Sequence, residues 1–261
     1  HLALVFATDH VLYCKEDETR ALDASLGDVY ARLADAELAV AHAMANEICG
    51  HRDSLRTLVQ ALGTLDALAA FAAAADAHTL VRPSIVGEPV LRIADARHIA
   101  VEAHVGRVVP NSITLDEQAR VAVLTGHNGA GKSVFVRTVG AAAAMAHAGA
   151  FVPAAQAEVG VADRIATRMC TRESASAGAG AFRTDAAQVG RMLALGTASS
   201  LLLVDEFGKG TVPLDGAALF AAAIGDLASR DDAPRTLAAT HFHAAYDVLA
   251  GLSIRWLAMD D

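Results

Sequence analysis

Cysteine and positive charge are scarce in this 261-residue sequence, and each shortage excludes a class of protein. The three cysteines, Cys14, Cys49 and Cys170, are far apart and form no C-x-x-C pair, which argues against a disulfide framework or a zinc site. We therefore expect a reducing, intracellular compartment. The formal net charge of −9 leaves no overall basic field for non-specific nucleic-acid binding, so any such contact is expected to be local or to lie outside this chain.

Long hydrophobic runs are also missing. The longest uninterrupted apolar stretches, around residues 67–75 and 216–225, reach about ten residues, whereas a membrane-spanning helix needs about 20. The sequence therefore predicts no membrane contact. No basic segment with a small-residue cleavage site opens the chain, and its first residue is His1, so we interpret it as a fragment cut upstream. Because 54% of the residues are hydrophobic, the chain can build the core of one large or two small domains.

The first third of the chain has the pattern of helices. From Glu16 to about Ile48 apolar residues recur at alternating spacings of four and three, which predicts one long amphipathic helix. A core-facing bundle helix and a coiled-coil seam both fit this pattern. The alanine-rich run 54–77 predicts a second helix, able to pack closely against a neighbour. Arg82-Pro83-Ser84 breaks the pattern, and we place a domain boundary near Val86.

The rest of the chain alternates short apolar segments with helical ones. Short strands are expected at 90–93 and 99–103, before a turn at Pro110-Asn111. Continuous apolar runs follow at 120–124, 201–204 and 236–239. Continuous runs that alternate with helices predict an α/β fold whose parallel sheet is buried on both faces.

The segment from Gly126 to Ser133, GHNGAGKS, fits the pattern G-x-x-x-x-G-K-[ST] and lies between a predicted strand and a predicted helix. Glycines let the backbone wrap around phosphates, so that N–H groups and the positive end of the helix face the anion. In this pattern Lys132 reaches the terminal phosphates and Ser133 the magnesium ion. A chance glycine turn is the alternative, but the context disfavours it, as does the fact that Lys132 is one of only three lysines.

The apolar run 201–204 leads into Asp205 and Glu206. A carboxylate at a strand end can hold magnesium, and a second one beside it can polarise an attacking water. Alone, this pattern is more typical of a solvated strand end; with the phosphate loop in the same chain, the functional interpretation is favoured. His241 follows another apolar strand and is a candidate γ-phosphate sensor. The alternative is a histidine at a strand end whose hydrogen bonds are satisfied and whose role is only structural.

Taken in order, these segments resemble the ATPase domain of the MutS family. The resemblance is carried by Arg97-His98, Val109-Pro110-Asn111, the loop 126–133, Phe151-Val152-Pro153, the block 202–211, Asp215-Gly216 and Ala239-Thr240-His241-Phe242. The DEFGKGT block at 205–211 is specific, since other members of the wider transporter-like ATPase group lack it. The chain is similar to the meiotic branch of the family, that of the fifth MutS homologue, in residues 22–24, 26–28, 173–174 and 205–211.

The resemblance implies the fold and the division of the chain. It implies a P-loop NTPase of the ABC type, MutS-like, with a mainly parallel sheet flanked by helices and preceded by an all-α segment. Residues 1–85 would be the C-terminal part of the helical core or lever domain. Residues 86–261 would be most of the ATPase domain.

The resemblance also assigns roles to matching positions. Phosphate-cradling residues would be Gly126, Asn128, Gly129, Gly131 and Lys132. Ser133 and Asp205 would hold Mg²⁺ for ATP, Glu206 would activate water and His241 would sense the γ-phosphate, while Asp215 falls in a loop that crosses between two ATPase subunits. The implied assembly is a nuclear heterodimer with the fourth MutS homologue. It would be an ATP-switched clamp around branched recombination DNA, contacted mainly by regions outside this fragment.

Three departures from the family pattern matter. Gly180-Ala181 stands where the family usually has a Ser-Thr pair before Phe182. Because a serine donor to a γ-phosphate makes a charge-assisted hydrogen bond, a site without it is expected to hydrolyse slowly or only to grip nucleotide. Ile99 and His127 replace common prolines, which is tolerable because neither position supplies an essential donor. The chain stops at Asp261, so we expect the C-terminal helices that help to hold family dimers to be missing.

The leading hypothesis is an ATP-dependent DNA-recombination clamp subunit with ATPase activity. A mismatch-repair MutS paralogue would use the same chemistry. A structural subunit that binds nucleotide without hydrolysing it is favoured by Gly180-Ala181 and opposed by the intact Glu206. A transporter or chromosome-scaffold ATPase would need a Leu-Ser-Gly-Gly signature, which the sequence lacks.

Overall fold

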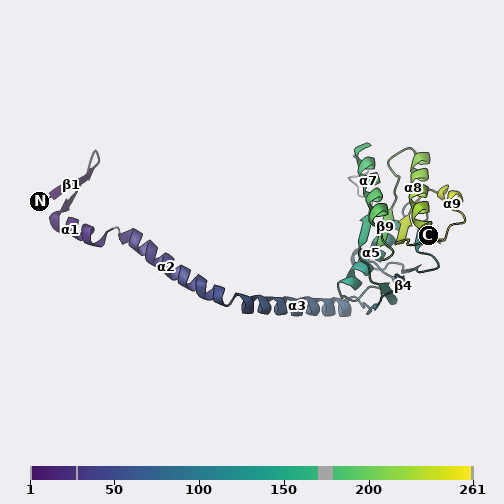
Figure 1. Ribbon diagram of the computed structural model, residues 1–261, viewed down its shortest axis with the longest axis horizontal. Coiled ribbons are helices and arrows are strands. Elements are labelled where there is room, and N and C mark those ends of the chain that lie inside the picture. The colour runs from purple at the N-terminus through teal and green to yellow at the C-terminus, as the bar shows by residue number, and fades with distance from the viewer. Residues whose placement is uncertain (1, 28, 170–178, 260–261) are drawn as a thin grey trace. The chain divides into compact units, whose positions relative to one another are not determined.

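The computed structural model describes residues 2–27, 29–169 and 179–259, and the chain divides into two units, residues 1–67 and 68–261 (Figure 1). This division follows the packing of the chain. The functional boundary predicted near Val86 is a different division and stays a prediction.

The first unit is a hairpin followed by helices. Strands β1 (Leu2–Ala7) and β2 (Leu12–Glu16) pair antiparallel and lead into α1 (Asp17–Leu26) and α2 (Val29–Gly50). The prediction of a single helix from 16 to 48 is wrong at Gly27. Gly27 has a positive φ of 67° with a ψ of −160°, a combination that glycine adopts readily and that takes the chain out of the helix, while its N–H still donates to the carbonyl of Asp23. The hairpin was not predicted.

Helices α1, α2 and α3 (Arg52–Ala77) contain no buried residue. The predicted close packing of the alanine-rich helix therefore has no counterpart in the part of the chain that the structure describes, and the choice between bundle and coiled coil stays open. By length and composition α3 also qualifies as a membrane-spanning helix, because an 18-residue window of it has a mean hydropathy of 1.6. The uninterrupted apolar runs of the sequence did not predict this, because polar residues divide the apolar residues of α3 into short stretches. The same signal comes from core helices of water-soluble proteins, so a single such helix is weak support for a membrane contact.

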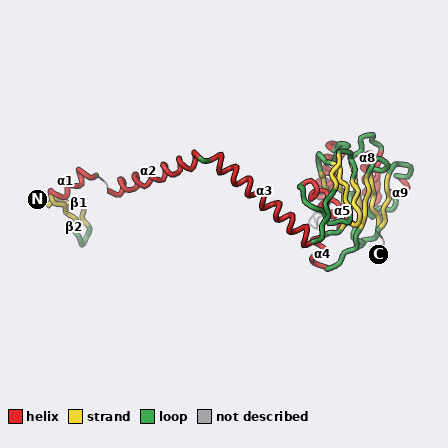
Figure 2. The backbone as a smooth tube through the Cα atoms, turned by 90° about the horizontal axis from the view of Figure 1, so that it is seen from below, coloured by secondary structure: helices red, strands yellow, loops and turns green. Residues whose placement is uncertain are grey.

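A five-stranded parallel sheet forms the centre of the second unit (Figure 2). Its spatial order is β11 (Ile254–Ala258), β6 (Val121–Thr125), β10 (Arg235–Ala239), β9 (Leu201–Asp205) and β8 (Ile165–Arg168). All four neighbouring pairs run parallel. The predicted parallel sheet is therefore confirmed, with the three continuous apolar runs as its central strands.

A second, mixed sheet of four strands packs against the same core. Its order is β3 (Ser84–Val86), β7 (Gln156–Gly160), β4 (Leu91–Ala96) and β5 (Asn111–Leu115). Within its described residues, the helices of this unit are α4 (Ile99–Val105), α5 (Lys132–His147), α7 (Ala179–Leu195), α8 (Pro213–Ala228) and α9 (Ala245–Val248).

Successive side chains of the central strands bury on opposite faces of the parallel sheet. In β9, Leu201 and Leu203 join a cluster with α5 and the mixed sheet, whereas Leu202 and Val204 join a cluster with α7 and α8. Figure 1 labels these helices around β9. Because side chains of a strand alternate with a period of two, a sheet covered on both faces needs apolar residues at every position.

The strand predicted at 99–103 is wrong, because these residues form helix α4. His98 caps the helix: its Nδ1 accepts a hydrogen bond from the Val101 N–H at 3.4 Å. An ion pair of 2.7 Å between Arg97 and Glu102 supports the first turn. The β-branched residues suggested a strand, but this capping outweighs their intrinsic preference.

A buried arginine joins the two sheets at the amino end of β10. Arg235 is 1% exposed, and its guanidinium donates to the carbonyls of Val90, Gly160, Val161 and Ser199 at 2.6–3.3 Å. Burial lowers its pKa below the usual value and the Arg120 charge lowers it further, while the Asp163 carboxylate opposes this shift without cancelling it. Four carbonyl oxygens thus take the place of a counter-ion.

Candidate functional site

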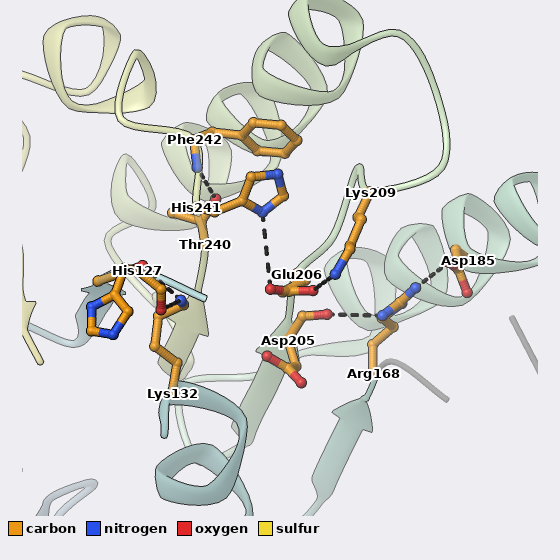
Figure 3. Close-up of polar contacts among 11 residues, drawn as sticks. His127, Lys132, Arg168, Asp185, Asp205, Glu206, Lys209, Thr240, His241 and Phe242 are labelled. Carbon is orange, nitrogen blue, oxygen red and sulfur yellow. Dashed lines mark hydrogen bonds and ion pairs between the residues drawn. The ribbon is translucent and has the colours of Figure 1, made fainter. Parts of the chain in front are cut away.

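The carboxyl ends of three neighbouring strands bring most of the predicted site residues to one edge of the parallel sheet (Figure 3). The loop 126–131 follows β6, Asp205 ends β9, and Thr240-His241 follows β10. Ligands in open α/β sheets bind at this edge, beyond the carboxyl ends of the strands. Parallel pairing explains the convergence, since it places all three strand ends on the same side.

The loop between β6 and α5 is built by glycines in conformations that other residues rarely adopt. Gly129 and Gly131 have φ values of 96° and 91°, and Gly131 is the residue from which α5 begins. Lys132 folds back over the loop, where its Nζ donates to the carbonyls of Gly126 at 2.7 Å and His127 at 2.8 Å. The lysine is 4% exposed, so its charge is held inside the loop, at the positive end of the helix.

A cavity of about 690 Å³ lies beside this loop. It is lined by His127 and Gly129–Gly131 of the loop, by α5, and by residues of three other segments: Ala96, His98, Val108, Val109, Asn111, Ala258 and Met259. Asp205 and Glu206 are not among its lining residues. This volume suits a small-molecule ligand, and the wall is mostly apolar with a few polar groups, as is usual for ligand pockets.

Asp205 is the best candidate for holding a metal ion. It is 1% exposed, and neither of its carboxylate oxygens has a hydrogen bond of normal geometry. Burial raises the pKa of this carboxyl; the Ser133 hydroxyl and the more distant Arg137 and Arg168 lower it, and Glu206 raises it further.

A buried carboxylate with free lone pairs, beside a hydroxyl, fits Mg²⁺, which is held by few protein oxygens and keeps waters and phosphates as its other ligands. No cluster of three or more His, Cys, Asp and Glu side chains occurs in the described ranges. A closed site of the zinc type therefore has no support there.

Glu206 has a strained backbone and a restrained side chain. Its φ of 49° lies in the left-handed region that non-glycine residues rarely occupy, and its N–H donates to the Ala239 carbonyl at 3.0 Å. One carboxylate oxygen accepts from Lys209 Nζ at 2.6 Å; the other lies 4.0 Å from His241 Nδ1. Figure 3 shows the carboxylate between these two partners. Such strain at a strand end is common where a side chain is aimed at a ligand.

His241 is held by its neighbours rather than by hydrogen bonds to its ring. Its ring lies 4.3 Å from that of Phe242, centroid to centroid. The Thr240 hydroxyl accepts from the Phe242 N–H at 3.0 Å and fixes the turn after β10. Nδ1 is buried without a hydrogen bond in the described structure, so the imidazole faces Glu206 with one polar atom still available.

Two residues of this edge were not predicted. Arg168, at the end of β8, is 2% exposed and donates through Nη1 to the main-chain oxygen of Asp205 at 2.8 Å. Its other amino group forms an ion pair with Asp185 of α7. Lys209 belongs to the predicted DEFGKGT block, but no role was assigned to it. Local pattern carries no signal for Arg168, because its partners are 17 and 37 residues away.

The remaining predicted residues lie less close together. Asn128 lies exposed in the loop, and Asp215 lies exposed in the first turn of α8. Among described contacts, no hydrogen bond or ion pair joins Asp215 to the loop or to the two carboxylates. Gly180 and Ala181 fall in the first turn of α7, but their side chains lie outside the described residues, as do Cys170 and Glu173-Ser174.

Comparison with known proteins gives one family model and many relatives. MutS domain V matches residues 122–253. MutS protein homolog 5 of Saccharomyces cerevisiae is 32% identical over 256 residues, 93% of this chain and 28% of that protein. MutS protein homolog 5 of Caenorhabditis elegans is 32% identical over 247 residues, 93% of this chain and 18% of that protein.

Mismatch-repair proteins match as well. DNA mismatch repair protein MutS of Chloroflexus aurantiacus is 36% identical over 233 residues, 87% of this chain and 24% of that protein. The chain spans about a quarter of the length of the curated relatives it matches.

Proposed function

The chain belongs to the MutS family, and on that premise we propose that it binds ATP with Mg²⁺ and hydrolyses it as the ATPase part of a DNA-binding clamp subunit. One observation carries this proposal. The buried Asp205 carboxylate, with both oxygens unpartnered, lies beside Ser133 and next to a glycine loop of the phosphate-binding pattern. An uncompensated buried carboxylate is costly in a fold, and a bound cation offsets that cost.

The phosphates of ATP would occupy the loop between Gly126 and Ser133. Gly126, Asn128, Gly129 and Gly131 would present main-chain N–H groups, and Lys132 would place its charge against the terminal phosphates. The cavity beside the loop would receive the remainder of the nucleotide. Ser133 and Asp205 would hold Mg²⁺, which neutralises charge on the phosphates when it is bound.

Glu206 and His241 would carry the chemistry of hydrolysis. The Glu206 carboxylate is 9% exposed and is available to orient a water molecule and accept its proton. His241, whose Nδ1 lies 4.0 Å from that carboxylate, would donate to a γ-phosphate oxygen from the next strand end. Asp215, exposed at the start of α8, would contribute across the interface to a second ATPase subunit.

The finer fold assignment is part of the same proposal. Residues 86–261 would be most of an ATPase domain of the ABC-like, P-loop kind. Residues 1–85 would be the end of a helical core or lever domain. The long helices α2 and α3, which bury no residue of their own, are consistent with a segment that packs against other parts of a larger protein.

For the complete protein we propose a nuclear role in meiotic recombination, as a heterodimer with the fourth MutS homologue on branched DNA. The two relatives named MutS protein homolog 5 support this assignment. The similarity to bacterial mismatch-repair MutS supports the second candidate, a mismatch-repair paralogue. Band shifts of the complete protein on a four-way junction and on a mismatched duplex separate the two. Clear preference for the mismatch would overturn the recombination assignment.

Steady-state ATP turnover by the complete protein with its proposed partner tests the enzymatic claim, with wild type set beside Glu206→Ala. We expect the turnover of this subunit to fall by about 100-fold or more, while ATP affinity changes by no more than about twofold. Glu117→Ala, at an exposed glutamate in the turn before β6, is the matched control and should leave both quantities unchanged. Equal rates for wild type and Glu206→Ala, with nucleotide still bound, would make this the structural subunit.

A further inference from the structure

We propose that Arg168, anchored by Asp185, is a positioning residue that fixes the peptide bond between Asp205 and Glu206 and so aims both carboxylates. The inference rests on the proposed ATPase function. It adds a residue pair outside the phosphate loop and outside the DEFGKGT block, and it assigns helix α7 a part in the site.

Both polar atoms of the Asp205–Glu206 peptide bond are held, each by a neighbouring strand. The Asp205 carbonyl accepts from Arg168 at the end of β8, at 2.8 Å. The Glu206 N–H donates to the Ala239 carbonyl at the end of β10, at 3.0 Å. Rotation of this peptide plane would break both hydrogen bonds. The plane lies between the candidate metal ligand and the candidate base, so its orientation sets the direction of both side chains.

Glu206 needs such a restraint more than other strand-end residues do. Its φ of 49° is unfavourable for a residue with a Cβ, and the backbone would relax toward an ordinary conformation if the peptide were released. Relaxation would move the carboxylate away from its place between Lys209 and His241. The Arg168 hydrogen bond opposes that movement from one side.

Arg168 in turn depends on Asp185. The guanidinium is 2% exposed, its Nε has no hydrogen bond in the described structure, and its Nη2 pairs with the Asp185 carboxylate, which is 16% exposed. A buried cation that loses its counter-charge becomes unstable in place and moves toward water. The position of Arg168, and with it the peptide, is therefore linked to α7 through one carboxylate (Figure 3).

Neither Arg168 nor Asp185 lines the cavity beside the phosphate loop, so their effect should fall on turnover rather than on ATP affinity. For the complete protein with its partner, we expect Asp185→Asn to lower this subunit's turnover about tenfold, with ATP affinity within about twofold of wild type. Asp185→Glu keeps the charge and should restore most of the rate. Asp226→Asn breaks the Arg230–Asp226 ion pair on α8 and serves as the matched control, with no change expected.

Hydrogen exchange gives a readout that does not need activity. In Asp185→Asn the Glu206 amide should exchange at least about tenfold faster than in wild type, while amides of β6 keep their protection. If β6 also loses protection, the pair is only structural and the inference is wrong. Unchanged exchange at Glu206, or an equal loss with Asp185→Glu, would also overturn it.

Two further results keep the test decisive. Should Asp185→Asn fail to fold, Arg168→Lys replaces it, since a lysine cannot reach both partners; the same local exchange and the same selective loss of turnover are expected. If wild type and Glu206→Ala hydrolysed ATP at the same rate, the proposed function would be rejected. The exchange experiment would still decide whether Arg168 holds the peptide bond between Asp205 and Glu206.

Discussion

The two ends of the parallel sheet each bury an arginine, but they use it differently. At the amino end, Arg235 donates to four main-chain carbonyls. At the carboxyl end, Arg168 supports one peptide, beside an Asp205 carboxylate without partners and a strained Glu206. Within the described residues, the buried charge at the amino end is surrounded by acceptors and only Arg235 Nε lacks a partner, whereas at the carboxyl end both oxygens of a buried carboxylate lack one. This contrast distinguishes a region that holds the fold from a region that is arranged to bind.

Aspartates at the two ends follow the same contrast. Hydrogen bonds from the hydroxyls of Thr197 and Ser200 lower the pKa of Asp163, which precedes β8 at the amino end. Burial raises the pKa of Asp205 at the carboxyl end. The fold thus stabilises the charge of one carboxylate and penalises the charge of the other.

The largest effect is expected at the amino end. Arg235→Met should lower the free energy of unfolding by about 3 kcal/mol, because buried carbonyls lose their donors. Urea denaturation measures this, and ATP affinity should be unchanged. Arg230→Met, at a half-buried arginine paired with Asp226, is the control and should cost no more than about 1 kcal/mol. Equal losses of unfolding free energy for the two variants would mean that the hydrogen bonds of Arg235 contribute no more to stability than the ion pair of Arg230.

At the carboxyl end, Gly208→Ala should cost about 2 kcal/mol, because a left-handed conformation disfavours a Cβ. Gly208 has a φ of 93°, and an added Cβ would lie 2.6 Å from the Gly216 oxygen. Turnover should fall as well, since Gly208 belongs to the loop that carries Lys209. Gly190→Ala in α7, where a Cβ meets nothing within 4 Å, is the control and should stabilise the protein by about 0.5–1 kcal/mol. A stable, active Gly208→Ala would contradict this packing.

Asp205→Asn should increase stability by about 1 kcal/mol at pH 7 without Mg²⁺ and nucleotide, because it removes a buried charge. The native pKa of Asp205 is raised, so the penalty is present above that pKa, shrinks as the pH falls below it and is gone below the unfolded-state pKa. The difference from wild type should therefore narrow on acidification. The variant should also lose Mg²⁺-dependent turnover. A destabilised variant at pH 7 would mean that the carboxylate is already satisfied.

The smallest effect is expected for Asp163→Asn. The native pKa of Asp163 is lowered, so its contribution to stability is present above its unfolded-state pKa and is lost as the pH falls through the native value. The variant should be slightly less stable at neutral pH and equal to wild type in strong acid. Urea midpoints at several pH values measure this. If the difference in stability between wild type and Asp163→Asn instead grew as the pH fell, the fold would not stabilise the charge of Asp163, and the contrast with Asp205 would be wrong.

The sequence predicted the parts of the site that depend on neighbours along the chain. The loop 126–133, the helix that follows it and the acidic end of β9 follow from local patterns that require special backbone conformations or continuous burial. Their convergence at one edge is a finding of the structure, and parallel pairing explains it because parallel strands end on the same side. Roles assigned to these residues remain proposals.

What the sequence did not predict depends on contacts between distant residues. Arg168 meets its partners only after β8, β9 and α7 pack together, and Arg235 meets carbonyls as far as 145 residues away. Helix α4 was mistaken for a strand because a cap on His98 and an ion pair to Glu102 outweigh β-branched residues. The hairpin of β1 and β2 has apolar residues on both faces, so it lacks the alternation that predicts a half-buried strand.

The alternating burial of β9 has a consequence for how this gene can change. Leu201 and Leu203 point to one cluster, and Leu202 and Val204 to the other. Loss or gain of a single codon in this strand would exchange the two faces and displace Asp205 from the strand end. Exchanges among leucine, valine and isoleucine alter only packing. Over many generations these residues can exchange with other apolar residues, whereas the number of codons in the strand that leads to Asp205 cannot change.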